Sequence, residues 1–373
     1  YARVLREVLP RLTPDLDVTL FALNTRDAAA TSSLPGVRVV VNGLLGDPYG
    51  REQLPRLVDE TQPDVVLLHH DLPLYSVFHE GLAEYRAARP HFRVIAYCPI
   101  EWEGTSEGNV RTLAGVDAAV TYTEFGARAV ERAFAGRADA PRVAVIGHGI
   151  DTSTFRPVAG ARRALWPDRP ELEDAFVVLN ANRNVPRKKI DLTMSAFAEF
   201  AAGKPDTYLY LHMGMLDNGI DVPVHARELG ITDRLLVTTD DQAPPKIGDE
   251  ELNLVYNACD VGLNTATGEG WGLVAFEHGA TGAAQVMPDH SACAELWRDR
   301  ALFAPVEPGR EEDGLVSRDG VVAALERLYA DGGLRARLGE AAREHALDPS
   351  FDWDTIAQSW RALLLDGPPR RDA

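Results

Sequence analysis

The chain alternates short apolar runs with stretches that have the spacing of amphipathic helices, and this alternation strongly limits the folds it can adopt. Such an alternation is typical of parallel sheets, because a parallel connection needs a crossover that is usually a helix. One series of expected strands comprises Asp17–Leu23, Val37–Val41, Asp64–Leu68, Phe92–Tyr97, Ala118–Tyr122 and Val143–Ile146. A second series comprises Phe176–Asn180, Tyr208–His212, Leu235–Thr238, Val261–Asn264 and Ala284–Met287.

The length of 373 residues predicts two domains rather than one. Residues 151–172, rich in proline, arginine and turn residues, are interpreted as the linker between domains 1–150 and 173–348. The helices that the spacing predicts most clearly are Ala2–Leu12, Tyr75–Ala88, Glu124–Ala135, Arg318–Ala330, Gly333–Ala346 and Asp352–Asp366. Because the chain opens inside an expected helix, we expect its true N-terminus, with a first strand and loop, to be missing.

The composition excludes several classes of protein. A net charge of −18 argues against duplex nucleic acid or an anionic membrane as a partner. The three cysteines form no C-x-x-C pair, so they predict neither a disulfide framework nor a zinc site and fit a reducing cytoplasm. No apolar run approaches the length of a membrane span, and no signal peptide is visible. We therefore expect a cytoplasmic protein with no metal site and no membrane span.

A glycine-punctuated stretch, Gly268–Glu277, follows the expected strand Val261–Asn264 and leads into a helical pattern. Glycines let the backbone approach a ligand closely, and a helix start offers N–H groups and a positive dipole end to a phosphate. The carboxylates of Glu269 and Glu277 would repel a phosphate but accept hydrogen bonds from hydroxyls. The stretch therefore predicts a ligand that is part anion and part polyol, such as a sugar nucleotide.

A basic cluster of four residues follows the strand Phe176–Asn180. It consists of Arg183, Arg187, Lys188 and Lys189. On an acidic chain this cluster predicts a local anion site, whereas the alternative is a solvated helix start.

Three motifs in order resemble those of the retaining family 4 glycosyltransferases, also called group 1. Glu269 and Glu277 stand in an E-x7-E arrangement, residues 183–188 match an R-x-x-P-x-K pattern, and residues 145–157 are similar to the segment VIPNGVDxxxFxP. The resemblance implies a GT-B fold, in which two doubly wound Rossmann-like domains face each other across a cleft. It also implies that the last segment, 349–373, is a helix that crosses back to the N-terminal domain.

The resemblance implies roles for the second domain, the donor-binding one. Arg183 and Lys188 would hold the diphosphate, Glu269 the sugar hydroxyls and Glu277 the ribose. The backbone amides expected to reach donor oxygens are those of Gly270, Trp271, Gly272, Leu273 and Val274. The alternatives are that Glu269 is an N-cap, that Glu277 is an ordinary helix residue and that Trp271 is a packing residue. Lys189 stands where the family often has glycine, so Arg187 or Lys189 could share the charge.

The first domain would carry the acceptor side. His69, His70 and Asp71 end the strand Asp64–Leu68 and either help to bind acceptor or form a hydrogen-bonded loop. Glu101 stands near the position where relatives carry a histidine and could accept a hydrogen bond from sugar or acceptor. His148, between two glycines, is interpreted as structural. A further departure is the segment 288–291, which replaces the usual glycine pair, and Ser291 is expected to be an N-cap.

The leading hypothesis is a retaining, metal-independent glycosyltransferase with a same-face mechanism. It would use a UDP- or GDP-linked sugar as co-substrate, no other cofactor, and an acceptor hydroxyl on a small molecule, a glycan or a lipid-linked molecule. The alternatives are a non-catalytic sugar-nucleotide-binding partner subunit and, on the same architecture, an epimerase or phosphorylase.

Overall fold

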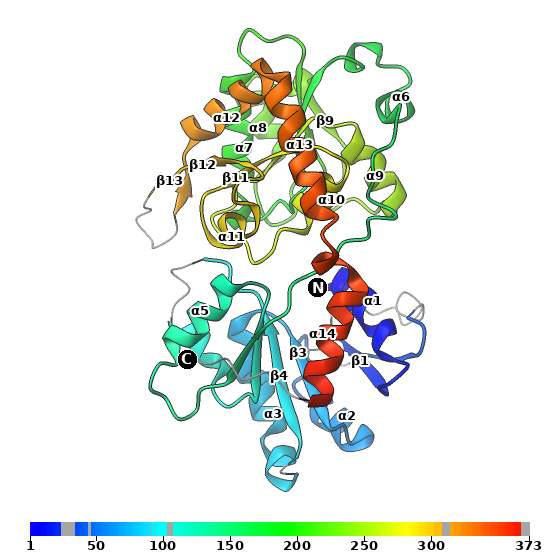
Figure 1. Cartoon of the computed structure of the whole chain (residues 1–373), viewed down its shortest axis with the longest axis vertical. Helices are drawn as coiled ribbons and strands as arrows, with labels where there is room; N and C mark the ends of the chain where they lie inside the picture. Colours follow the sequence, from blue (N-terminus) through cyan, green and yellow to red (C-terminus); the bar gives the residue numbers. More distant parts are fainter. Residues whose placement is uncertain (24–33, 44–45, 90, 103–106, 308–313, 367–373) are drawn as a thin grey trace. The chain divides into compact units, whose positions relative to one another are not determined.

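The computed structural model describes residues 1–23, 34–43, 46–89, 91–102, 107–307 and 314–366. The chain divides into two compact units, which are described separately (Figure 1). The first unit combines residues 1–100, 105–149 and 352–373, and the second combines residues 101–104 and 150–351. Glu101 and Trp102 thus belong to the second unit, although the preceding strand belongs to the first.

The second unit is built on a six-stranded parallel sheet. Its strands are β7 (Phe176–Asn180), β8 (Thr207–Leu211), β9 (Leu235–Val237), β10 (Val261–Leu263), β11 (Ala284–Pro288) and β12 (Leu302–Ala304). The strand order is β12-β11-β10-β7-β8-β9, so the chain winds outwards from β7 on one side and then from β10 on the other. This order places a topological switch point between β7 and β10, where open parallel sheets bind ligands beyond the carboxyl ends of the strands.

Helices surround this sheet (Figure 1). They are α6 (Ala161–Leu165), α7 (Ile190–Phe200), α8 (Val222–Glu228), α9 (Asp249–Asn257), α10 (Leu273–Ala280), α11 (Ser291–Trp297), α12 (Arg318–Ala330) and α13 (Gly332–Ala346). Helix α7 illustrates why they form, because its buried residues Ile190, Met194 and Phe197 recur at helical spacing. This stripe packs in one apolar core with sheet residues such as Val178 and Leu209. Each such side chain stabilises the unit by about 1.5–3 kcal/mol.

Short elements complete the second unit. They are the antiparallel pair β13 (Val306–Glu307) and β14 (Leu315–Val316) and the 3-10 turns η3 (Pro170–Leu172), η4 (Pro186–Lys188), η5 (Thr232–Arg234) and η6 (Pro349–Phe351).

The first unit contains a four-stranded parallel sheet and a separate parallel pair. The sheet has the order β3-β4-β5-β6, and β1 pairs with β2. The strands are β1 (Val18–Ala22), β2 (Val37–Val41), β3 (Val65–His69), β4 (Arg93–Cys98), β5 (Ala118–Thr121) and β6 (Arg142–Val145). The helices and turns are α1 (Ala2–Leu12), α2 (Gln53–Thr61), η1 (Leu72–Leu74), α3 (Tyr75–Ala88), α4 (Glu107–Val110), η2 (Arg111–Leu113), α5 (Glu124–Ala133) and α14 (Trp353–Asp366).

The last helix, α14, belongs to the first unit and packs there through two tryptophans. The ring of Trp360 lies edge-on to that of Tyr97, with 4.7 Å between centroids. A Cβ on Gly149 would lie 2.6 Å from the ring of Trp353. This close approach explains why a glycine occupies position 149.

The predicted parallel organisation is confirmed, and all eleven expected strands are present with ends within one residue of the prediction. The strands β12, β13 and β14 were not predicted. They are two or three residues long, too short for a periodic pattern to separate them from a loop. The acidic stretch 308–313 lies outside the described residues.

Candidate functional site

A network of amide and hydroxyl groups organises the carboxyl ends of β7 and β10 at the switch point. The side-chain Nδ2 of Asn180 donates to Thr193 Oγ1 over 2.8 Å, and Thr193 Oγ1 lies 2.7 Å from Thr265 Oγ1. Asn180 Oδ1 also accepts from the backbone N–H of Asn182. Since these groups are buried and satisfy one another, they fix the two loops that leave β7 and β10.

Lys188 ends the turn η4 after β7 and carries its charge into the protein. Its side chain is 8 % exposed, and its ammonium contacts the carboxylate of Glu269 in a charge-assisted hydrogen bond. The next residue, Lys189, has φ +48°, a left-handed conformation that glycine adopts more easily, so a glycine would suit this position. Thr265 Oγ1 lies 3.0 Å from the carbonyl oxygens of both lysines and anchors the turn to the β10 loop.

Glu269 is the buried carboxylate of the site. Burial alone would raise its pKa, but the charges of Lys188 and Arg187 and hydrogen bonds from Lys188 and Asn264 outweigh that effect and leave the pKa below its ordinary value. Glu269 is therefore ionised at neutral pH. The resulting ion pair lies at the switch point. There an anionic ligand can replace Glu269 as the partner of Lys188, and a hydroxylated ligand can replace Lys188 as the partner of Glu269.

The loop between β10 and α10, residues 264–272, is called the Glu269 loop, and on one side it contacts Glu101 and Trp102. The carbonyl oxygen of Glu101 accepts from the N–H of Glu269 over 2.8 Å, while its carboxylate pairs with Arg187 at 2.9 Å. A Cβ on Gly268 would lie 2.7 Å from that carbonyl oxygen and 2.9 Å from the ring of Trp102. Gly268 is thus required by the close approach of another backbone.

The other side of the loop is held by His290 and Ser291. The Nε2 of His290 lies 3.0 Å from the carbonyl of Ala266, which can only accept, so Nε2 carries a proton. In the neutral imidazole, Nδ1 then accepts from Ser291 Oγ at 2.8 Å, and Ser291 Oγ accepts from the N–H of Glu269 at 3.3 Å. The prediction that Ser291 is the N-cap of α11 is wrong. His290 is the N-cap, and the Ser291 hydroxyl serves the Glu269 loop instead.

The helix α10 begins immediately after this loop. Its N-cap is Gly272, with φ +92°, so the alternative that Glu269 caps the helix is wrong. The predicted donor-binding amides of Gly270, Leu273 and Val274 lie in the loop and the first turn, where the helix dipole is positive.

Trp271 packs inside the second unit. Its ring stacks on Phe276 with centroids 5.3 Å apart and an interplanar angle of 13°. The ring of Phe351 meets it edge-on at 5.8 Å. These contacts give the Trp271 side chain a packing role, as one of the alternatives had it.

Glu277 lies one turn into α10 and is 4 % exposed. The hydroxyl of Tyr256 donates to its Oε2 over 2.9 Å. Glu277 and Glu269 thus have different neighbours: a neutral tyrosine hydroxyl holds the first, and a lysine ammonium holds the second.

Arg183 lies on the surface of the β7 loop. It makes a bidentate pair with Asp217, with N···O distances of 2.9 and 3.0 Å, and its side chain is 61 % exposed. Arg183 and Lys188 therefore hold different carboxylates. Of the predicted catalytic residues, the structure brings Lys188 and Glu269 into direct contact and places Arg183 in a separate, solvated ion pair.

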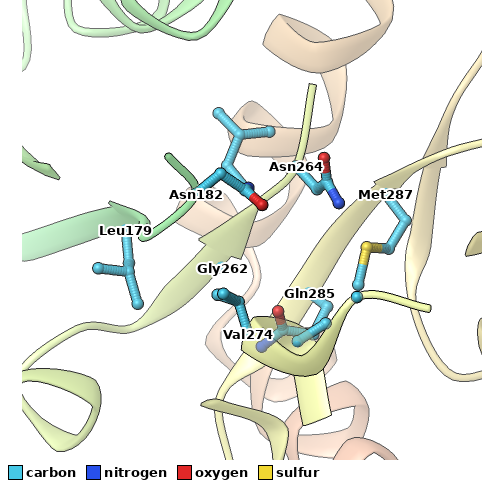
Figure 2. A pocket seen from close by; sticks show the side chains of 10 residues that line it. Leu179, Asn182, Gly262, Asn264, Val274, Gln285 and Met287 are labelled. Atoms are coloured by element: carbon cyan, nitrogen blue, oxygen red, sulfur yellow. The ribbon is translucent and has the colours of Figure 1, made fainter. Parts of the chain in front are cut away.

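A small cavity opens at the switch point (Figure 2). Figure 2 shows Asn182 and Asn264 on one side of it and Val274 and Gln285 on the other. Its volume of about 10 Å³ is room for about one water molecule. The cavity is thus a polar recess beside the start of α10 rather than a pocket for a whole nucleotide.

In the first unit, His69 ends β3 inside a group of aromatic rings. Its Nε2 lies 3.0 Å from the hydroxyl of Tyr122, and burial lowers its pKa well below the ordinary value. The neighbouring turn is hydrogen-bonded: the N–H of Asp71 donates to His70 Nδ1, and Tyr75 donates to the carbonyl of His70. The acceptor role of His69, His70 and Asp71 stays a prediction.

His148 packs against the same aromatic group. Its ring centroid lies 4.3 Å from that of Tyr122, and burial lowers its pKa to about 3. A neutral, buried ring agrees with the structural interpretation of His148. Glu101 lies in the second unit beside Arg187, and its contact with sugar or acceptor stays a prediction.

The residues of the site that were not predicted include Asn264, Tyr256 and His290. Asn264 is recognisable in retrospect, because a polar residue directly after a buried strand at a switch point is well placed for a ligand. The contacts of Tyr256 and His290 come from other segments, 21 and 24 residues away along the chain, and no local pattern predicts them.

Two properties of the described residues concern metal ions and membranes. Within the described ranges, no group of three or more histidine, cysteine, aspartate or glutamate side chains is arranged to hold a metal ion. In the same part of the chain, none of the helices combines the length and apolar character needed to cross a bilayer.

The chain is similar to several bacterial proteins named D-inositol 3-phosphate glycosyltransferase. It is 32 % identical to that of Salinispora arenicola over 231 residues, which are 58 % of this chain and 48 % of the relative. Identity to that of Stackebrandtia nassauensis is 31 % over 275 residues, 71 % and 57 % of the two chains. The chain thus spans about half the length of these curated relatives. No protein-family model matches it.

Solved structures share the fold over nearly the whole chain. Sucrose-phosphate synthase from Thermosynechococcus elongatus superposes with a TM-score of 0.73 at 20 % identity, covering 98 % of this chain and 92 % of the other. HepE of Anabaena, in complex with UDP and glucose, gives 0.72 at 17 %, covering 96 % and 94 %. WaaG, a glycosyltransferase of lipopolysaccharide biosynthesis, gives 0.67 at 14 %, covering 97 % and 95 %.

At these identities the solved structures establish the GT-B fold. In sequence the chain is similar to group 1 glycosyltransferases over about half of their length.

Proposed function

We propose that this protein transfers a sugar from a nucleoside diphosphate to an acceptor hydroxyl, with retention of anomeric configuration and without a metal. The observation that carries the proposal is the buried pair of Lys188 and Glu269 at the switch point, directly before α10. A buried ion pair contributes little net stability, because desolvation of the two charges offsets their attraction. A pair kept at a ligand-binding position is better explained by binding than by stability.

The donor would exchange with existing partners in the site. A diphosphate bound beside the start of α10 would draw Lys188 away from Glu269, and Glu269 would then accept hydrogen bonds from the sugar hydroxyls. Arg187, already beside Glu269, and Arg183, on the rim, would add positive charge. One structural neighbour, HepE of Anabaena, was solved with UDP and glucose and with UDP-glucose, which supports a UDP-linked donor as the first choice.

The transfer step forms a bond between the acceptor oxygen and the anomeric carbon as the bond from that carbon to the diphosphate oxygen breaks. Both events take place on one face of the sugar, and the leaving phosphate oxygen takes the acceptor's proton. Charge develops on the departing diphosphate, so cationic side chains and helix amides stabilise the transition state more than the ground state.

A thermal-shift panel tests the donor assignment. The panel contains UDP, GDP, UDP-glucose, UDP-N-acetylglucosamine and GDP-mannose. A ligand at about 100 times its dissociation constant adds about 2.7 kcal/mol to the free energy of unfolding, so the right donor raises the melting temperature by several degrees. We expect either the UDP compounds or the GDP compounds to stabilise the protein, and the compounds of the other nucleotide to have little effect. No stabilisation by any member would contradict the proposed function.

We expect transfer to survive removal of divalent metal ions. Cationic side chains and helix amides would balance the leaving diphosphate, so treatment with excess EDTA should change the turnover rate by less than about twofold. The measurement compares turnover before and after EDTA, with Mg²⁺ restored as the control. A loss that Mg²⁺ reverses would contradict the metal-independent mechanism.

A further inference from the structure

Tyr256 contacts the second carboxylate of the site from a neighbouring helix. It lies in the last turn of α9, and its hydroxyl donates to Glu277 Oε2 over 2.9 Å. Tyr256 is 1 % exposed and Glu277 4 %. In surroundings this dry, a hydrogen bond is stronger than in water, so it restrains the rotation of the carboxyl group.

The tyrosine ring is itself held in place. Its centroid lies 5.7 Å from that of Phe155 and 5.5 Å from that of His278, which neighbours Glu277 on α10. Phe155 belongs to the segment 145–157 that the sequence analysis singled out. The packing therefore connects that segment to Glu277 through the ring of Tyr256.

Helix α9 also fixes the backbone on either side of Phe155. The side-chain oxygen of Asn253 accepts from the N–H of Arg156 over 3.2 Å, and that of Asn257 accepts from the N–H of Val158 over 2.7 Å. Asn253, Tyr256 and Asn257 thus form one face of α9 that holds residues 155–158 on one side and reaches Glu277 on the other.

We infer that Tyr256 is a positioning residue for nucleotide recognition: it orients the carboxylate of Glu277 so that this carboxylate accepts from the ribose hydroxyls. The inference rests on the proposed function, and it takes from the family resemblance the expectation that Glu277 receives the ribose. A carboxylate has two oxygens, and when a fixed donor holds Oε2, the orientation of Oε1 is set as well. Such a carboxylate discriminates a ribose from a sugar that lacks the hydroxyls, because the sugar without hydroxyls cannot donate the hydrogen bond that the ribose supplies.

The test is a calorimetric titration of the full chain with UDP, GDP and their 2′,3′-dideoxy analogues. The wild type should bind the ribonucleotide of one series at least about tenfold more tightly than its dideoxy analogue. Tyr256→Phe removes the hydroxyl and keeps the ring, and it should weaken ribonucleotide binding about tenfold while leaving dideoxynucleotide binding unchanged. A merely structural role of Tyr256 would weaken both ligands alike.

Tyr210→Phe is the matched control. Tyr210 is also buried in the second unit, and its hydroxyl lies 3.0 Å from Thr238 Oγ1 on the β9 side of the sheet. This variant loses one buried tyrosine hydroxyl without a link to Glu277, so it should discriminate ribose as the wild type does.

The outcomes separate this inference from the proposed function. Binding of neither nucleotide by the wild type would overturn both. Discrimination in the wild type that Tyr256→Phe retains would overturn the role of Tyr256 and leave the proposed function intact. Equal loss of ribo- and dideoxynucleotide binding in Tyr256→Phe would reduce Tyr256 to a packing residue and overturn the inference as well.

Discussion

Replacement of Lys188 by alanine is expected to lower the transfer rate by about 10²- to 10³-fold. Lys188 is the buried cation of the site, and loss of one preorganised charge or donor at a developing negative charge typically costs 10²–10³ in turnover. Lys189→Ala is the neighbouring control, because Lys189 follows Lys188 directly but forms no salt bridge with any of the residues that the structure describes. Steady-state kinetics with the donor found in the thermal-shift panel measure both variants. Near-native turnover in Lys188→Ala would remove Lys188 from the mechanism.

The same variant should lose stability, because it leaves Glu269 buried without its closest cation. Removal of one partner from a buried pair costs about 3–5 kcal/mol, and the low end applies here since Arg187 and Asn264 remain near Glu269. Urea denaturation measures this loss. The double variant Lys188→Met, Glu269→Gln removes both charges, and it should recover most of the stability while it stays inactive. Recovered stability without activity would separate the structural effect from the catalytic one.

The pH dependence of stability should change sign at this position. In the wild type the pKa of Glu269 lies below its ordinary value of 4.5, so its contribution to stability is present above that value and is lost as the pH falls through the folded-state pKa. In Lys188→Ala, burial dominates and raises the pKa. Lowering the pH towards 4.5 should therefore relieve part of the destabilisation in the variant. A destabilisation that is independent of pH would contradict an unpaired Glu269 as its cause.

Gly268→Ala should disrupt the Glu269 loop. The new Cβ would lie 2.7 Å from the carbonyl oxygen of Glu101, so the backbone must move and the hydrogen bond from the Glu269 N–H must lengthen. We expect a loss of about 1–3 kcal/mol in stability and about 100-fold in transfer, because a shift of about 1 Å near the reacting groups has that effect. Urea denaturation and steady-state kinetics measure the two quantities.

Gly248→Ala is the matched control for this substitution. A Cβ at Gly248 meets no atom within 4 Å, and its φ of −75° suits any residue. Because Gly248 is the N-cap of α9 and alanine is a poorer N-cap, the control should lose up to about 1 kcal/mol of stability but keep full activity. If Gly268→Ala behaves like Gly248→Ala, the contact between the loop and Glu101 has no functional importance.

The sheets were predictable from sequence because the strands of buried parallel sheets are continuous apolar runs. Phe176–Asn180 and Val37–Val41 were predicted with the same ends as in the structure, and helix α12 likewise. The order of the strands, and hence the switch point between β7 and β10, was not predicted, because the pairing of strands depends on tertiary structure. Strand β12 was not predicted, because a strand of three residues is too short to show a periodic hydrophobic pattern.

The charged residues of the site were predictable where they belong to a sequence motif. The residues that they contact were not predictable. The sequence singled out Lys188 and Glu269, but their direct ion pair joins residues 81 positions apart. The pairing of Arg187 with Glu101 likewise depends on tertiary structure, because the two residues are far apart along the chain. Ser291 was misjudged because capping preferences are local, whereas its hydroxyl serves a loop 22 residues away.

The most direct measurement is a crystal structure of the protein with its nucleotide sugar bound. We predict the diphosphate beside the start of α10 and within hydrogen-bonding distance of Lys188, with Glu269 released from Lys188 and turned to the sugar hydroxyls. A nucleotide sugar bound elsewhere, or bound while the Lys188–Glu269 pair stays intact, would contradict the account.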